Sequence, residues 1–119
     1  MRNLTIQREK SIIACLAKIR IFIEDEHGDL ILDGIKCKQI GVLKNGETDS
    51  YSITSENIKV FVVFSKIAPQ KYHAVRQLEA GQNVELFTGP TGDPLAGNPF
   101  NIFTRQDLIN SGIRGGWKL

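Results

Sequence analysis

Four carboxylates and one imidazole fall in a single short stretch, the densest set of chemically capable groups in the chain. Residues 24–29 read Glu-Asp-Glu-His-Gly-Asp. Carboxylate-rich loops can hold calcium, but the ligand spacing and the glycine position here do not fit the twelve-residue calcium loop between two helices. A solvated turn between strands explains the same composition. We therefore expect a turn and no metal site, with calcium binding as the alternative.

His27 and His73 are the two histidines, and each is a candidate general base. A nucleophile–base pair needs a serine or cysteine within reach, and Ser65 or Cys15 would supply it. No nucleophile elbow or similar local motif surrounds either residue. We therefore expect no enzyme and no cofactor. A small hydrolase or metal-dependent enzyme that uses His27 or His73 is the weakest alternative.

Cys15 and Cys37 each lie in an apolar alternation, as Ile13, Cys15 and Ala17 illustrate. Buried free cysteines behave as small apolar side chains, and we expect this role for both. A disulfide between neighbouring strands is an alternative. Metal ligation is another, although no second cysteine or nearby histidine completes a site.

Residues 89–99 contain three glycines and three prolines, which predicts a long irregular loop. The loop lacks the Lys-Ser/Thr ending of a phosphate-binding loop. Long irregular loops in small domains are often functional, so a binding loop and a plain surface turn are both open. The contact residues predicted here are Gly92, Asp93, Asn98 and Phe100.

Trp117 lies between Arg114 and Lys118 near the C-terminal end. Tryptophan and arginine are enriched where protein partners bind most strongly, so Trp117 is a second candidate contact. The alternative is that Trp117 folds back onto the body or belongs to a frayed end.

The charge balance argues against polyanionic partners. Residues 1–103 hold 12 basic and 12 acidic side chains, and the net charge of +2 comes from the last 16 residues. A body near neutrality is a poor match for nucleic acid or an anionic membrane. One set of basic and aromatic residues could bind nucleic acid: Lys36, Lys38 and Tyr51. Acidic residues near them in the sequence weaken the positive potential of this set. We expect no nucleic-acid partner and no membrane partner.

The chain shows neither a signal peptide nor a stretch of roughly 20 apolar residues, so the expected compartment is the cytoplasm.

Extended segments with a period of two dominate the sequence. Leu4 to Gln7 and Ser11 to Glu24, the latter bent at residues 14–17, alternate apolar and polar positions. Further strands are expected at Leu30 to Leu32, Ile35 to Leu43, Thr48 to Ile53, Ile58 to Ser65, Asn83 to Thr88 and Phe100 to Phe103. Ile58 to Ser65 is apolar on both faces, which is typical of a central strand covered on both sides. Tyr72 to Leu78 fits a helical turn or a strand, and we favour the strand.

Two turn signals connect these strands. Asp33-Gly34 favours a turn with positive φ, and Asn45-Gly46 predicts a type I′ hairpin flanked by a Lys44–Glu47 pair. Thr104 is expected to cap a short helix that Gly112 ends, followed by a flexible tail.

These elements predict an all-β protein, a two-sheet sandwich of about seven strands in residues 1–103, with a short helix and tail in residues 104–119. The sequence predicts a well-defined core and contains no recognisable set of residues for acid–base catalysis. This favours a non-catalytic binding module for an unknown protein or small ligand. Free edge strands make a self-associating structural subunit, a homo-oligomer, the alternative.

The chain also resembles a family of small uncharacterised bacterial proteins, mostly from Gram-positive lineages, with matches over most of residues 8–103. The resemblance implies a β-rich fold and assigns no activity and no site residue. Its hairpin and central strand are similar to bacterial accessory β-sandwich modules, an analogy of fold alone. The matching pieces are Arg8-Glu9-Lys10-Ser11, Cys15 with Lys18, Ile23-Glu24-Asp25, Leu43-Lys44-Asn45-Gly46-Glu47, Val60-Phe61-Val62-Val63 and Ala96-Gly97-Asn98-Pro99-Phe100.

Overall fold

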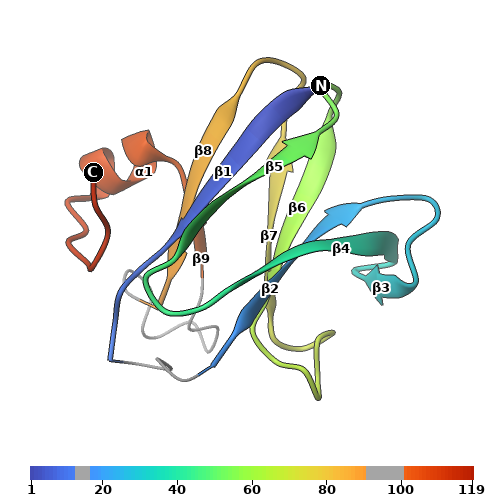
Figure 1. Cartoon of the computed structure of the whole chain (residues 1–119), viewed down its shortest axis with the longest axis horizontal. Helices are drawn as coiled ribbons and strands as arrows, with labels where there is room; N and C mark the ends of the chain where they lie inside the picture. The colour runs from blue at the N-terminus through green and yellow to red at the C-terminus, as the bar shows by residue number, and fades with distance from the viewer. Residues whose placement is uncertain (13–16, 91–100) are drawn as a thin grey trace.

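The computed structural model describes residues 1–12, 17–90 and 101–119, and strands dominate this part of the chain (Figure 1). The strands are β1 (Arg2–Arg8), β2 (Ile19–Glu24), β3 (Leu30–Leu32), β4 (Ile35–Leu43), β5 (Thr48–Ile53), β6 (Ile58–Val63), β7 (His73–Leu78), β8 (Val84–Gly89) and β9 (Asn101–Phe103). A single short helix, α1 (Arg105–Ser111), follows them. The predicted all-β class with a short C-terminal helix is confirmed, and the Tyr72 to Leu78 region is a strand.

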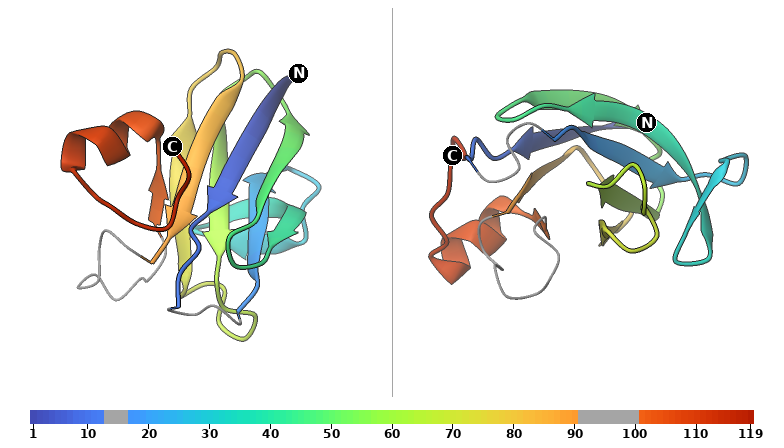
Figure 2. Two further views of the ribbon diagram at one scale, coloured as in Figure 1. Left: turned by 60° about the vertical axis from the view of Figure 1, so that its left-hand side comes forward. Right: turned by 90° about the horizontal axis from the view of Figure 1, so that it is seen from below.

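The strands form two sheets that pack against each other, which confirms the sandwich (Figure 2). One sheet has the order β5-β1-β8-β9, and the other has the order β3-β4-β2-β6-β7. Strand β1 pairs antiparallel with β5 and parallel with β8, while the second sheet is antiparallel throughout. Strands β7 and β9 are edges of different sheets, and they lie near each other on one side of the sandwich.

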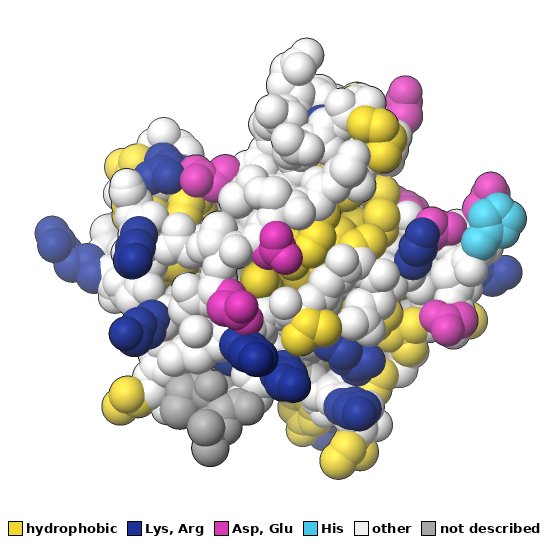
Figure 3. Space-filling view, viewed as in Figure 1, with side chains coloured by type: hydrophobic (Ala, Val, Ile, Leu, Met, Phe, Trp, Pro, Cys, Tyr) yellow, Lys and Arg dark blue, Asp and Glu magenta, His cyan; other side chains and the backbone are white. Residues whose placement is uncertain are grey.

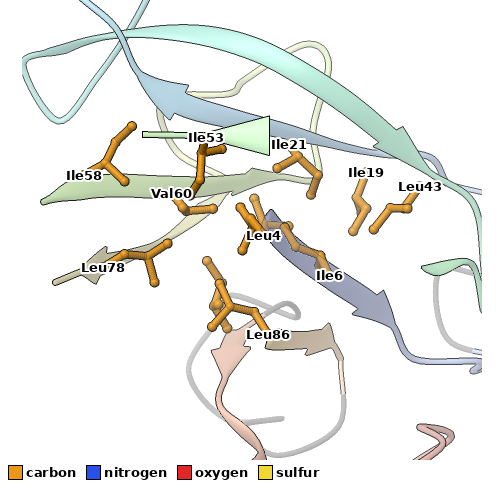
Figure 4. Packing of buried hydrophobic residues seen from close by; sticks show 12 residues of the cluster. Leu4, Ile6, Ile19, Ile21, Leu43, Ile53, Ile58, Val60, Leu78 and Leu86 are labelled. Carbon is orange, nitrogen blue, oxygen red and sulfur yellow. The ribbon is translucent and has the colours of Figure 1, made fainter. Parts of the chain in front are cut away.

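The main core lies between the sheets and draws on strands of both (Figure 4). Alternation along β6 decides which side chains enter it: Val60 and Val62 join this core, whereas Phe61 and Val63 point to the other face of the same sheet. There they form a second cluster with Phe22, Leu32 and Cys37. Strand β6 is therefore covered on both faces, as its unbroken apolar run predicts.

The long predicted strand from Ser11 to Glu24 is wrong at its described residues 11, 12, 17 and 18, which are not in a strand. Strand β1 ends at Arg8, and β2 begins at Ile19 in the other sheet. The chain must leave one sheet and enter the other between them. Glu9 N still donates to Thr88 O of β8 at 2.8 Å, which ends the β1–β8 pairing, whereas Lys10 N donates to Gly116 O in the C-terminal tail at 2.9 Å. The expected bend at residues 14–17 falls largely outside the described residues.

The predicted Asn45-Gly46 hairpin is also wrong. Strands β4 and β5 belong to different sheets, so this turn carries the chain across the sandwich. Gly46 has φ +76°, but Asn45 does not share the positive φ that a type I′ turn requires. The Asn45 amide oxygen instead accepts from Ser11 N at 3.0 Å. The Glu47 carboxylate accepts from Lys44 N at 2.6 Å, where the sequence suggested a cross-strand pair.

Asp33-Gly34 is the turn with the type I′ signature. Asp33 has φ +52° and Gly34 has φ +79°, and Leu32 pairs directly with Ile35 across the two-residue loop. The prediction of a positive-φ turn at this position is confirmed. The resulting β3–β4 hairpin places Leu32 and Cys37 in the second cluster.

Cys37 is a free, buried thiol, in line with the expected core role. Desolvation by burial raises its pKa, so the thiol stays protonated and unreactive. Cys15 lies outside the described residues. No helix in the described segments is long and apolar enough to cross a bilayer.

Tyr51 of β5 crosses to the other sheet and lies over Gly41 of β4. A Cβ on Gly41 would be 2.3 Å from the Tyr51 ring, so only glycine leaves room for it. Strand β4 has a bulge here, because the register shifts between Ile21 and Phe22 of β2. Burial of the ring, with Asp49 and Glu47 nearby, raises the pKa of Tyr51 to about 12.

We expect the raised pKa of Tyr51 to make the stability of the protein depend on pH under alkaline conditions. The native state keeps the Tyr51 proton up to about pH 12, whereas an unfolded tyrosine loses it near pH ~10. The free energy of unfolding should therefore fall as the pH rises from ~10 towards ~12, and Tyr51→Phe should remove that part of the slope. Absorbance of ionised tyrosine, followed with pH in both proteins, checks this. A Tyr51 that ionises near pH ~10 in the folded protein would contradict it.

Candidate functional site

Four of the five predicted contact residues lie outside the described part of the chain: Gly92, Asp93, Asn98 and Phe100. The acidic stretch at residues 24–29 forms a turn in which Asp25 accepts from His27 N at 2.8 Å. Within the described residues, no group of three or more His, Cys, Asp or Glu side chains is placed to hold a metal ion.

His73 is held by two structural contacts. Its Nδ1 lies 2.8 Å from Pro69 O, and its Nε2 lies 3.0 Å from the Asp33 carboxylate. These contacts join the start of β7 to the preceding loop and to the tip of the β3–β4 hairpin. The His73 ring also packs on Phe61, with ring centroids 5.9 Å apart. His73 therefore helps to close the second apolar cluster.

Trp117 folds back onto the sandwich. Its indole Nε1 donates to Thr88 O at 3.0 Å, and its ring meets Phe103 edge-on at a centroid distance of 6.0 Å. Trp117 is only half-buried, and it lines a cavity of about 580 Å³. The structure shows Trp117 in contact with the body of the protein, which is one of the interpretations of the sequence. Contact of Trp117 with a partner stays a prediction.

The chain around Trp117 is fastened to the end of β1, more firmly than a flexible tail would be. Gly116 N donates to the buried Glu9 carboxylate at 3.0 Å, and the Gln7 amide nitrogen donates to Lys118 O at 3.0 Å. A Cβ on Gly116 would lie 1.9 Å from Lys10 O, and one on Gly115 would lie 2.4 Å from the Glu9 carboxylate. The Gly-Gly pair is therefore what lets the tail approach this closely.

Replacing Gly116 with alanine is expected to detach the tail while the sandwich stays folded, because the new Cβ collides with backbone. Trp117 is the only tryptophan, so its fluorescence should shift to longer wavelength and become easier to quench with acrylamide. The matched control is Gly81→Ala, where a Cβ meets nothing closer than 3.9 Å. Unchanged fluorescence in Gly116→Ala would contradict the docked tail.

A larger cleft, of about 760 Å³, opens where β7, β9 and α1 meet. Its polar lining residues include Arg76, Asn101, Asp107, Asn110 and Ser111, and its apolar ones include Val75, Ile102, Phe103 and Ile113. It is bounded by the edge strands of both sheets, β7 and β9. We call it the β7–β9 cleft.

An ion pair crosses this cleft. Arg76 Nη1 donates to the Asp107 carboxylate at 2.7 Å and to Ile102 O at 3.2 Å, which ties β7 to β9 and to the start of α1. Thr104 caps α1, as the sequence predicts, because its Oγ1 accepts from Asp107 N at 3.1 Å, and Asp107 completes the cap by accepting from Thr104 N at 2.9 Å. The backbone N–H of Thr104 lowers the pKa of Asp107, and Arg76 lowers it further. Asp107 is therefore ionised at neutral pH, as its ion pair with Arg76 requires.

The free edge of β7 forms one wall of the cleft. Phe64 N donates to Tyr72 O at 3.2 Å just before β7. Antiparallel pairs alternate, so Ala74 and Arg76 bond to β6 while the backbone groups of Val75 and Gln77 face away from it. Strand β7 ends its sheet in the described structure, which leaves these outward groups available.

Asn101 contributes an unsatisfied donor at the opposite wall. Its amide nitrogen is buried and has no hydrogen-bond partner among the described residues. A buried donor of this kind costs stability unless something bonds to it. Neither Arg76 nor Asn101 is among the contact residues that the sequence predicted, since nothing in their local sequence marks the strand that carries them as an edge.

Comparison of the chain with protein-family models, with curated proteins and with solved structures finds no match. The resemblance to small bacterial proteins therefore stays a prediction.

Proposed function

We propose that this protein is a non-catalytic binding module that takes an extended peptide segment along the edge of β7, inside the β7–β9 cleft. The observation that carries the proposal is the free edge of β7: the backbone groups of Val75 and Gln77 face away from β6, and Val75 lines a cleft of about 760 Å³. An added strand satisfies such groups with main-chain hydrogen bonds, which supply affinity for many peptide sequences.

The polar groups of the cleft favour particular peptides. Asn101, whose amide nitrogen is buried, lines the side of the cleft opposite β7. The hydrogen bonds of Arg76 within the described structure use Nη1, which leaves donors of its guanidinium for an acidic side chain. Ile102, Phe103 and Ile113 provide apolar contact beside them. We therefore expect an extended ligand with one acidic and one apolar residue facing the cleft.

The test uses the full chain, immobilised, and a phage-displayed library of random heptapeptides. The decisive variant is Val75→Pro, because proline removes one outward N–H, does not break the ladder to β6, and is tolerated on edge strands. Enriched peptides should bind Val75→Pro at least ~10-fold more weakly, a loss of ~1.4 kcal/mol. The control Val75→Thr keeps the N–H and should bind within ~2-fold.

Failure to enrich any peptide, or equal affinity for both variants, would contradict the proposal. Self-association is separated by light scattering over a dilution series. A dimer that Val75→Pro abolishes would mean that β7 receives a second copy of the chain instead, as in the alternative of a structural subunit.

A further inference from the structure

Four segments distant in sequence meet at one end of the sandwich, the lower end in Figure 1. The strand register requires this: Ile19 pairs with Leu43, Arg20 pairs with Val63, and Gln7 pairs with Thr48. The segments that follow or precede these pairs are residues 9–12, residues 17–20, the turn at residues 44–47 and the loop at residues 64–72. We call the described residues of these segments the basic end.

The charge of the chain is concentrated here, although its total is small. The basic end carries six basic and two acidic side chains, a net charge of +4 against +2 for the whole chain. Glu9 is buried, and Glu47 bonds to the backbone of its own turn. The basic side chains are Lys10, Lys18, Arg20, Lys44, Lys66 and Lys71. Lysine and arginine gather over the lower half of the face in Figure 3.

The opposite end of the strands is acidic. Strand β2 ends at Glu24, β6 starts after Glu56 and Asn57, and β7 is followed by Glu79. The total charge, which argued against an anionic membrane, therefore hides a separation of charge along the sandwich. At moderate salt, charges are screened beyond about 10 Å. A charged surface that meets one end of the sandwich therefore responds to the charge of that end and not to the total charge of the chain.

Two isoleucines project from the basic end. Ile12 is 93% exposed and Ile67 is 97% exposed, and each is within two residues of a lysine, Lys10 or Lys66. Single exposed apolar residues are common. Here two almost fully exposed aliphatic side chains occupy separate segments at the same charged end, which is the composition of a surface that meets the boundary between lipid headgroups and acyl chains.

The loop that carries Ile67 is held in shape. The backbone N–H groups of Lys71 and Tyr72 both donate to Ala68 O, at 3.2 and 3.1 Å, and Ser65 Oγ accepts from Ala68 N at 3.0 Å. The Phe64 and Tyr72 rings pack on each other, with centroids 6.1 Å apart. Ile67 is therefore presented on an ordered base, and little conformational freedom remains to be lost when it enters an interface.

We propose that the basic end binds the surface of a lipid bilayer that contains anionic lipid. Ile12 and Ile67 enter the interfacial layer, and the lysines and Arg20 contact lipid phosphates. Nucleic acid fits less well, because single-strand binding uses exposed aromatic rings, whereas Phe64 and Tyr72 are half-buried against each other. The basic end is separate from the β7–β9 cleft, so failure of one proposal leaves the other unaffected.

Flotation of the full chain with lipid vesicles tests this. We expect binding to vesicles of phosphatidylcholine and phosphatidylserine at ~7:3, binding at least ~10-fold weaker to phosphatidylcholine alone, and release by ~0.5 M NaCl. Ile12→Ser with Ile67→Ser, and separately Lys66→Glu with Lys71→Glu, should each weaken binding at least ~10-fold. Thermal unfolding of each variant verifies that it is folded.

The matched controls lie away from the basic end. Lys36→Glu with Lys38→Glu makes the same change of charge on β4, near Glu24, and Ile109→Ser removes an exposed isoleucine from α1. Both should leave vesicle binding within ~2-fold. The proposal is overturned if the folded wild type ignores phosphatidylserine vesicles or if the controls weaken binding as much as the variants. It is also overturned if a single-stranded oligonucleotide binds the same surface more tightly and without regard to Ile12 and Ile67.

Discussion

Replacing Arg8 with methionine is expected to lower the free energy of unfolding by about 3 kcal/mol. Arg8 is 1% exposed, and its Nη1 donates to Ala17 O at 2.6 Å and to Leu43 O at 2.8 Å. These bonds tie the end of β1 to the approach to β2 and to the end of β4, which belong to the other sheet. Methionine keeps much of the volume, but it leaves the buried Leu43 carbonyl and the partly buried Ala17 carbonyl without this donor. Equilibrium unfolding in urea measures the difference.

The matched control is Lys44→Met, which removes a cation from an exposed position one residue beyond Leu43. We expect a change of at most about 0.5 kcal/mol there. A loss below about 1 kcal/mol in Arg8→Met would mean that Arg8 is not a fastening between the sheets.

Replacing Phe61 with alanine is expected to cost about 4 kcal/mol, the loss typical of a fully buried phenylalanine. Phe61 has no exposed surface, and it lies in the second cluster with Phe22, Leu32 and Val63, outside the main core. The size of the effect depends on whether the β3–β4 hairpin and the loop before β7 really cover this face of the sheet. Urea unfolding gives the value, and Phe61→Leu, which keeps most of the volume, should lose less than half as much.

A loss near 1 kcal/mol for Phe61→Ala would mean that the second cluster is open to water. In that case β6 would be covered on one face only, and the interpretation of its unbroken apolar run would be wrong.

Local patterns predicted the strands well and their partners badly. The run from Val60 to Val63 indicates burial on both faces because alternation fails along it, and the structure agrees. Asn45-Gly46 has the strongest hairpin signal in the chain, yet it crosses between the sheets. Turn propensity reports φ and ψ preferences over a few residues, whereas strand partners are decided by packing among residues far apart in sequence. The parallel pairing of β1 with β8 is another such result.

The sequence also did not predict the burial of charged residues near strand ends. Arg8 and Glu9 look like surface residues by type, but both are buried, and they hold the sheets together and fix the tail. The capping of α1 by Thr104 and Asp107 was predictable because its spacing is local. Arg76 and Asn101 come to line one cleft only because the strand order makes β7 and β9 edges, and no short motif encodes that order.

Hydrogen–deuterium exchange, resolved by residue, tests the central claim most directly. A heptapeptide enriched on the immobilised protein is added to the full chain, and amide exchange along β7 is compared with and without it. We predict slower exchange at Val75 and Gln77, with Ala74 and Arg76 unchanged because they already bond to β6. Uniform protection along β7, or protection confined to strands away from the β7–β9 cleft, would contradict the account.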